Sequence, residues 1–143
     1  MTDPLADLLE RLFVAGVAIT TRALTEALPQ LDLTFPQWRV LLIVGEAPDG
    51  ATVSEVASRV GVTVPATSRQ LRRLARRGLL AIRRDEHDRR AVRARLTDDG
   101  LAARDRILAY RRARIAETVA GVHRSEATLA ALDKVAGAFD VFR

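Results

Sequence analysis

The sequence has no cysteine and few aromatic residues. None of its 143 residues is Cys, and only 4% are Phe, Trp or Tyr. Without cysteine, this chain cannot form a disulfide, sense oxidants through a thiol or bind a metal through sulfur. A core that is poor in aromatic residues must be built from Ala, Leu, Val and Ile, and such a core favours closely packed helices over sheets.

Long apolar runs are also missing. No stretch approaches the roughly 18 apolar residues that are needed to cross a bilayer, and the first residues, Met1 to Pro4, do not begin a signal peptide. We therefore expect a soluble, cytoplasmic protein with no membrane partner. The hydrophobic fraction of 48% is nevertheless enough for a folded core, and 143 residues is the size of one domain.

The net charge of +5 is distributed unevenly along the chain. Residues 51–97 contain twelve Arg and four acidic residues, which gives +8. The remainder contains eleven basic and fourteen acidic residues, which gives −3, and the two parts sum to +5. A basic module between slightly acidic flanks is typical of a protein that binds a polyanion.

Apolar residues recur at three- and four-residue steps, which is the spacing of one face of a helix. Predicted helices span residues 5–28, 35–46, 53–60, 64–77, 98–120 and 125–140. The pattern from Thr52 to Glu55 is typical of a capping box, and Gly61 suits the left-handed residue that ends a helix. Segments 79–82 and 92–96 indicate two strands around a polar tip. The expected fold is mainly α with a small β-hairpin wing, in a winged helix-turn-helix head.

The second helix of the helix-turn-helix is predicted to lie in the major groove of DNA. Leu71 and Leu74 are expected to pack against the rest of the domain. The other faces of the helix carry polar and basic side chains, as a helix that lies in a major groove requires. Arg69 is the predicted base contact, and Thr67 and Ser68 are expected either to contact DNA or to pack inward. The arginines further along are expected to neutralise phosphates. The predicted DNA-binding residues of this helix are Thr63, Pro65, Ala66, Thr67, Ser68, Arg69, Arg72, Arg73 and Arg76.

The hairpin is the second predicted contact with DNA. A basic finger of this size can rest on the backbone or enter a narrow minor groove, whose negative potential attracts arginine. Asp88 is expected to orient one of the arginines through a bidentate salt bridge. The predicted DNA-binding residues of the wing are Arg83, Arg84, Asp88, Arg89 and Arg90.

Two other classes of function were weighed against DNA binding. The segment Glu86-His87-Asp88 contains metal-ligand and acid–base residue types, but three adjacent residues on a hairpin tip cannot converge on one ion. We therefore predict no catalytic residues, no metal and no cofactor. A winged-helix module that binds protein without touching DNA is the alternative. The arginines of the second helix favour DNA.

Apolar stripes at both ends of the chain predict a homodimer. The stripes at 5–23 and 129–139 lie outside the compact head, so pairing with a second copy explains them better than burial within one chain. We expect residues 1–33 and 98–143 to form the dimerisation region and residues 34–97 to form the head. Twofold symmetry would place the two reading helices about 34–36 Å apart, one turn of DNA.

The order of these motifs resembles the MarR family of bacterial regulators. The resemblance covers most of the chain, from the approach to the second helix to the start of the fifth. The matching segments are Leu33-Thr34-Phe35-Pro36-Gln37-Trp38, Gly61-Val62-Thr63, Ser68-Arg69, Leu74, Gly78-Leu79, Asp88-Arg89-Arg90 and Leu96-Thr97-Asp98-Asp99-Gly100. On this resemblance Thr63, Ser68 and Arg69 carry over as recognition-helix residues. Asp88 and Arg90 carry over as wing residues.

The resemblance also implies a mode of action. It implies a homodimer with intertwined first and last helices, in which two heads read a palindromic operator, most often as a repressor. Many relatives bind a small, often aromatic, acid between the dimer helices and the head, and then release DNA. Phe13, Trp38 and Leu42 are the candidates for such a pocket here, because they are bulky and flank the head. The alternative is that all three are ordinary core residues.

The chain also departs from the family. Thr67, preceded by Pro65 and Ala66, stands where many members have a β-branched apolar residue, so the resemblance does not predict the base preference. The absence of cysteine places the chain outside the branch that senses peroxides through a thiol.

Overall fold

The computed structural model describes residues 3–85, 88 and 91–142. Most of this part of the chain is helical, with one small sheet, so the predicted fold class is confirmed. In chain order the elements are α1 (Pro4–Glu26), η1 (Pro29–Leu31), α2 (Phe35–Gly45), β1 (Ala51–Thr52), α3 (Val53–Val60), α4 (Val64–Arg76), β2 (Leu80–Arg84), β3 (Val92–Leu96), α5 (Asp98–Thr118), α6 (Glu126–Ala138) and η2 (Asp140–Phe142).

Side-chain caps explain where the helices begin. Each of the α-helices follows an Asp, Thr or Ser whose side-chain oxygen accepts a hydrogen bond from a backbone N–H of the first turn. The capping box predicted from Thr52 to Glu55 is confirmed, and a second one joins Thr34 and Gln37. Gly61 ends α3 with φ +77°, the left-handed conformation predicted for it.

The sheet has three antiparallel strands in the order β1-β3-β2. The pair β2 and β3 forms the predicted hairpin, with Leu80 opposite Leu96 and Arg84 opposite Val92. Strand β1 was not predicted, because two residues are too short to show an alternating pattern. It places Ala51 opposite Ala94 and so attaches the hairpin to the start of α3.

The core lies in the head and is mostly aliphatic, as the composition predicted. Residues of α2, α4 and α5 meet there, and Trp38 is its one large aromatic side chain among the fully buried residues described. The largest fully buried side chains are Trp38, Leu41, Leu71, Leu74, Leu79, Ile107, Val40, Val44, Val56 and Thr67.

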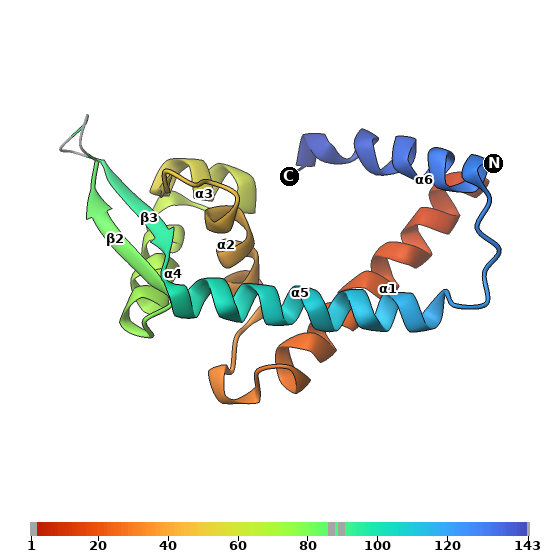
Figure 1. Ribbon diagram of the computed structural model, residues 1–143. Coiled ribbons are helices and arrows are strands. Elements are labelled where there is room, and N and C mark those ends of the chain that lie inside the picture. Colours follow the sequence, from red (N-terminus) through yellow and green to blue (C-terminus); the bar gives the residue numbers. More distant parts are fainter. Residues whose placement is uncertain (1–2, 86–87, 89–90, 143) are drawn as a thin grey trace.

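Helix α5 carries the chain away from the head to the opposite end of the molecule, where α6 and the first half of α1 lie (Figure 1). There the rings of Phe13 and Phe139 meet edge to face, with 5.0 Å between their centroids. The apolar residues of this end remain largely exposed: Leu5, Leu8, Leu12, Phe13, Val14 and Val17 on α1, Ile115 on α5, Val119 and Val122 after it, Leu129 and Leu132 on α6, and Val141. In the described part of the chain, no helix is both long and apolar enough to cross a membrane.

Candidate nucleic-acid interface

Helix α4 is fixed to the head by its apolar side. Leu71 and Leu74 are buried in the core. The helix begins at Thr63, whose Oγ1 accepts a hydrogen bond from the N–H of Ala66 at 3.4 Å. It follows α3 after the left-handed turn at Gly61. The two helices therefore form the predicted helix-turn-helix, with α4 as the second helix.

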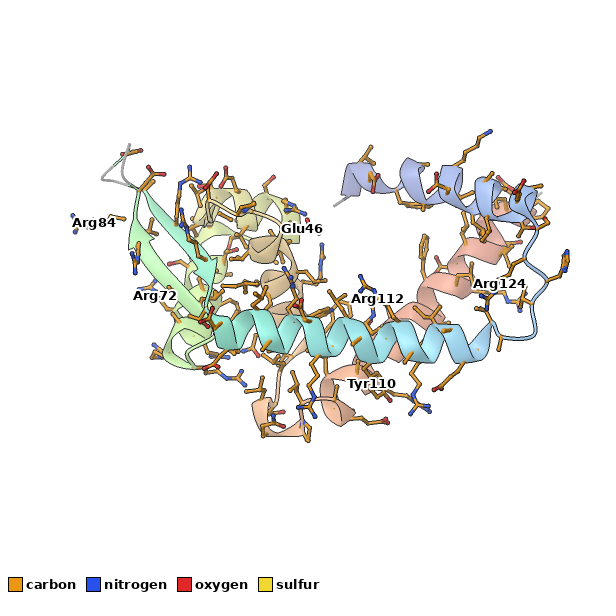
Figure 2. The ribbon with its side chains drawn as sticks, in the orientation of Figure 1. Glu46, Arg72, Arg84, Tyr110, Arg112 and Arg124 are labelled. Carbon is orange, nitrogen blue, oxygen red and sulfur yellow. The ribbon has the colours of Figure 1, made fainter. Side chains whose placement is uncertain are left out.

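The opposite side of α4 is basic and exposed. Arg69, Arg72, Arg73 and Arg76 all lie at the surface. The guanidinium of Arg72, labelled in Figure 2, folds back along the helix and donates to the carbonyl oxygen of Ser68 at 3.3 Å and to its hydroxyl at 2.9 Å. The helix thus presents a rigid row of positive charge, the arrangement that binding in a charged groove requires.

Thr67 does not belong to this exposed surface. Its side chain is only 1% exposed, and its hydroxyl donates to the carbonyl oxygen of Thr63 at 3.1 Å. Positions four and seven residues later are the buried Leu71 and Leu74, so Thr67 lies on the same inward face. The prediction that Thr67 contacts DNA is wrong, and the packing alternative is correct. Ser68 beside it is half-buried.

The first turn of α4 is accessible. Pro65 is exposed and Ala66 is half-buried. Because these side chains are small or rigid, the backbone of the first turn stays close to the surface. The N-terminal turn is the part of a groove-binding helix that approaches base edges. Their contact with DNA stays a prediction.

Of the wing arginines predicted to contact DNA, the two that the structure describes point to solvent. Arg83 and Arg84 are exposed at the end of β2, and Figure 2 shows Arg84 beside the hairpin. Arg89 and Arg90 lie outside the described residues, as do Glu86 and His87. The DNA contacts predicted for Arg89 and Arg90 therefore stay predictions.

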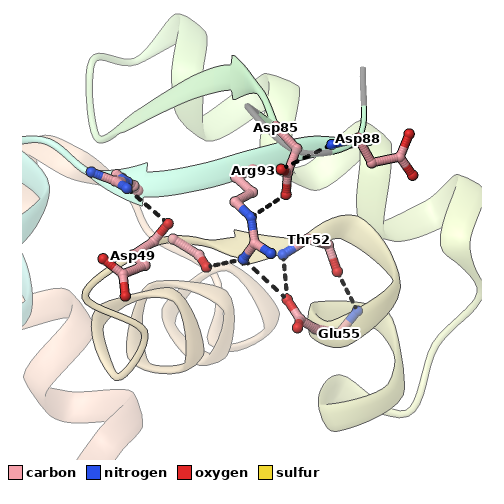
Figure 3. A network of polar contacts seen from close by, with 8 residues as sticks. Asp49, Thr52, Glu55, Asp85, Asp88 and Arg93 are labelled. Carbon is pink, nitrogen blue, oxygen red and sulfur yellow. Dashed lines mark hydrogen bonds and ion pairs between the residues drawn. The ribbon is translucent and has the colours of Figure 1, made fainter. Parts of the chain in front are cut away.

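The base of the wing is held by an arginine that the sequence analysis missed (Figure 3). The Nε of Arg93 on β3 pairs with Oδ2 of Asp85, which is only 7% exposed. Its Nη1 donates to the carbonyl oxygen of Gly50 at 2.9 Å and lies 4.0 Å from Oε2 of Glu55. The charge of Asp85 is therefore compensated within the wing.

The pKa shifts of this network follow its contacts. Hydrogen bonding to Asp85 raises the pKa of Arg93. The backbone N–H and side chain of Thr52, and then the charge of Arg93, lower the pKa of Glu55. Both shifts favour the charged forms of Arg93 and Glu55. Through this network, the hairpin is attached to the first turn of α3.

Asp88 contributes to the same region through its backbone. Its N–H donates to Oδ1 of Asp85 at 3.2 Å. The bidentate salt bridge predicted for the Asp88 side chain concerns the neighbouring arginines of the tip, which lie outside the described residues, and it stays a prediction. The pair of Arg93 and Asp85 could not be predicted from the sequence, because the two residues come together only in the register of the hairpin.

The three residues predicted to line a ligand pocket do not come together. Trp38 is a core residue, 1% exposed, and Phe13 packs against Phe139 at the far end of the molecule. Leu42 lines a pocket of about 320 Å³, and neither Phe13 nor Trp38 is among the lining residues of that pocket. Within one chain the three residues therefore do not line one pocket, and Trp38 fits the alternative of an ordinary core residue. The lining residues of the observed pocket are Arg39, Leu42, Ile43, Glu46, Arg59, Leu108 and Arg111.

This pocket between α2, α3 and α5 is rich in arginine. Within the described part of the chain, the Nε–H groups of Arg59 and Arg111 are buried and have no hydrogen-bond acceptor. Burial also lowers the pKa of Arg111, since desolvation disfavours the charged form. Neither residue could be recognised from the sequence. Arg111 stands in a run with Arg112 that is typical of a solvated helix face, and Arg59 is a single arginine in the last turn of its helix.

Comparison with known proteins relates this fold to regulators. Residues 31–91 match the model of the MarR family. The HTH-type transcriptional regulator TtmR of Methylorubrum extorquens (strain PA1) is 37% identical over 79 residues, which are 55% of this chain and 40% of that protein. The chain spans about half the length of the curated relatives that it matches.

Solved structures share the whole fold. The crystal structure of Streptococcus pneumoniae FabT in complex with DNA is similar with a TM-score of 0.78 and 24% identity, covering 96% of this chain and 94% of that one. The PcaV regulator of Streptomyces coelicolor, solved with its natural ligand, is similar with a TM-score of 0.64 and 29% identity, covering 99% and 95% of the two chains.

Proposed function

We propose that this chain, whose residues 31–91 match the model of the MarR family, is a transcriptional regulator of that family that binds a palindromic double-stranded DNA operator as a homodimer. The observation that carries the proposal is the two-sided helix α4. Its leucines are buried in the head, and Arg69, Arg72, Arg73 and Arg76 are exposed on its other faces. A basic helix on a rigid support is what direct reading of a major groove needs.

The dimer is supported by the apolar surface at the far end of the molecule. Residues 1–33 and 98–143 form the proposed dimerisation region, and residues 34–97 form the DNA-binding head. Contiguous exposed apolar surface marks an interaction site in a folded protein, and a second copy supplies an identical apolar surface through twofold symmetry. We place the protein in the cytoplasm, where its DNA would be.

Repression and release by a ligand complete the proposal. A dimer seated on an operator blocks access to the promoter, and PcaV, the ligand-bound relative, supports control by a small molecule. We place the ligand in the arginine-rich pocket between α2, α3 and α5 instead of near Phe13 and Trp38. Guanidinium groups there suit a carboxylate, and Leu42, Ile43 and Leu108 suit an apolar body.

Selection of bound sequences from random double-stranded DNA tests the proposal. The expected result is a palindrome with half-sites one helical turn apart, and an affinity that falls steeply with salt because phosphates are neutralised. Failure to retain any DNA at low ionic strength would reject the proposal. It would favour the alternative, a winged-helix module that binds protein.

Arg69→Ala is expected to weaken operator binding by about 1–3 kcal/mol and to relax the preference at one base pair in each half-site. The reason is that a planar guanidinium in the second turn of α4 is placed to pair with guanine O6 and N7. Fluorescence anisotropy on the selected operator and on single-base variants measures both effects. Arg124→Ala, which removes an exposed arginine far from the head, is the control. Unchanged base discrimination in Arg69→Ala would remove this assignment.

A further inference from the structure

The pocket between α2, α3 and α5 already holds a carboxylate of the chain itself. Glu46, the residue that ends α2, pairs through Oε2 with Nη2 of Arg59 in the last turn of α3. Both side chains line the pocket. The pair thus joins two helices of the head at the place where a ligand would enter.

The arginines of the pocket outnumber its carboxylates. The lining residues include three arginines and one acid, Glu46. Among the described residues, Nε–H groups of Arg59 and Arg111 lack acceptors, so the capacity of these guanidinium groups to donate is not filled by the protein. Leu42 and Leu108 supply an apolar wall. The pocket suits a carboxylate with an apolar body, and such a ligand would meet Arg59 in competition with Glu46.

The position of Arg59 is coupled to the reading helix. Arg39 on α2 donates through Nη2 to the carbonyl oxygen of Arg59 at 3.1 Å and through Nη1 to that of Val60 at 3.4 Å. These carbonyls belong to the last turn of α3, where a helix leaves acceptors without internal partners. Helix α4 begins only a few residues later, after Gly61. The contacts that hold the end of α3 therefore lie next to the start of α4.

We propose that Glu46 acts as a built-in competitor for the ligand. It holds Arg59 while the protein is bound to DNA. An external carboxylate displaces it from Arg59, loosens α3 from α2 and weakens operator binding. The inference rests on the proposed function. Because linkage is reciprocal, the operator must weaken carboxylate binding by the same factor. Since the ion pair is partly exposed, we expect this factor to be up to about fivefold.

Benzoate is the probe, and three forms of the full chain are compared: wild type, Glu46→Gln and Arg59→Gln. Calorimetry gives the Kd for benzoate, and anisotropy gives the Kd for the selected operator with and without saturating benzoate. Both variants should bind the operator more weakly than wild type, because each breaks the pair. Glu46→Gln should bind benzoate up to about fivefold more tightly and Arg59→Gln more weakly. If the benzoate Kd changes in opposite directions in the two variants, the result indicates competition, because a general loss of structure would weaken benzoate binding in both.

The decisive quantity is the operator Kd measured with saturating benzoate, divided by the operator Kd measured without it. In wild type benzoate should raise the operator Kd, whereas in Glu46→Gln the ratio should fall toward one. Asp49→Asn, which removes an exposed carboxylate from the turn between α2 and β1, should retain the wild-type ratio. An unchanged ratio in Glu46→Gln, or no benzoate binding to wild type, overturns the inference while operator binding stands. A wild-type protein that binds no operator would instead reject the proposed function, on the operator measurement alone.

Discussion

Leu12→Glu should turn the protein from a dimer into a monomer in solution and abolish tight operator binding. Leu12 lies on α1 in the apolar surface at the far end of the molecule and is 52% exposed in the single chain. Burying a leucine side chain contributes about 1.5–3 kcal/mol. Twofold symmetry repeats the substitution, so the dimer should lose roughly 3–6 kcal/mol, or about two to four orders of magnitude in its dissociation constant.

The loss of DNA binding follows from the loss of the second head. A dimer engages two half-sites at once, and the second contact is made at a high effective concentration. A monomer keeps its arginines but has only one half-site to hold, so specific binding should approach the nonspecific level. Sedimentation equilibrium gives the mass, and anisotropy gives the operator affinity.

Leu101→Glu is the matched control for Leu12→Glu. Leu101 is also an exposed leucine on a helix, with 42% of its surface accessible. Although it belongs to the region 98–143, it lies in the first turn of α5 beside the head, outside the apolar surface at the far end of the molecule. A glutamate there faces the positive end of the helix dipole and should be tolerated. The dimer proposal would be contradicted if Leu12→Glu kept the wild-type mass, or if Leu101→Glu became monomeric to the same extent.

Gly100→Ala should destabilise the head by about 3 kcal/mol and lower the melting temperature by roughly 10 °C. The start of α5 is packed directly on the backbone after α4: the N–H of Thr97 donates to the carbonyl oxygen of Leu79 at 3.2 Å. A Cβ on Gly100 would lie 2.0 Å from that same oxygen. Because the oxygen belongs to backbone, the helix itself has to move, and the hydrogen bonds at its first turn are disturbed.

Gly137→Ala separates this clash from the ordinary effect of a methyl group. Gly137 lies near the end of α6, and a Cβ added there meets no atom within 4 Å. Alanine at an unstrained helical position usually stabilises by about 0.5–1 kcal/mol. Thermal unfolding of the two variants should therefore shift in opposite directions. Equal shifts would mean that the contact between Gly100 and Leu79 does not restrict side-chain size.

The helices could be predicted from the sequence because each one is specified locally. Apolar spacing and a capping residue such as Thr52 or Ser125 act within a few positions of the chain, and the predicted and observed helix ends differ by only a few residues. Thr67 could also have been assigned to the buried face from its position in the helix. Its spacing to Leu71 and Leu74 already assigned it to the buried face, but its polar side chain kept a DNA contact open.

The contacts that hold the wing and the pocket could not be predicted in this way. Arg93 reaches Asp85, Gly50 and Glu55 only once the strands adopt their register. Arg59 on α3 and Arg111 on α5 line the same pocket only after both helices have packed against α2. Such contacts depend on the tertiary structure. In the sequence alone, these arginines cannot be distinguished from ordinary surface arginines.

Helix α5 determines how the reading head is aimed. Its 21 residues form a rod about 31 Å long, in which each residue turns the chain by about 100°. The head is attached at one end of the rod, and the apolar surface lies toward the other. One residue more or fewer along it would therefore rotate the arginines of α4 by more than a quarter-turn relative to the apolar surface. In the proposed dimer, the length of α5 would thus set the angle at which the two heads meet their half-sites.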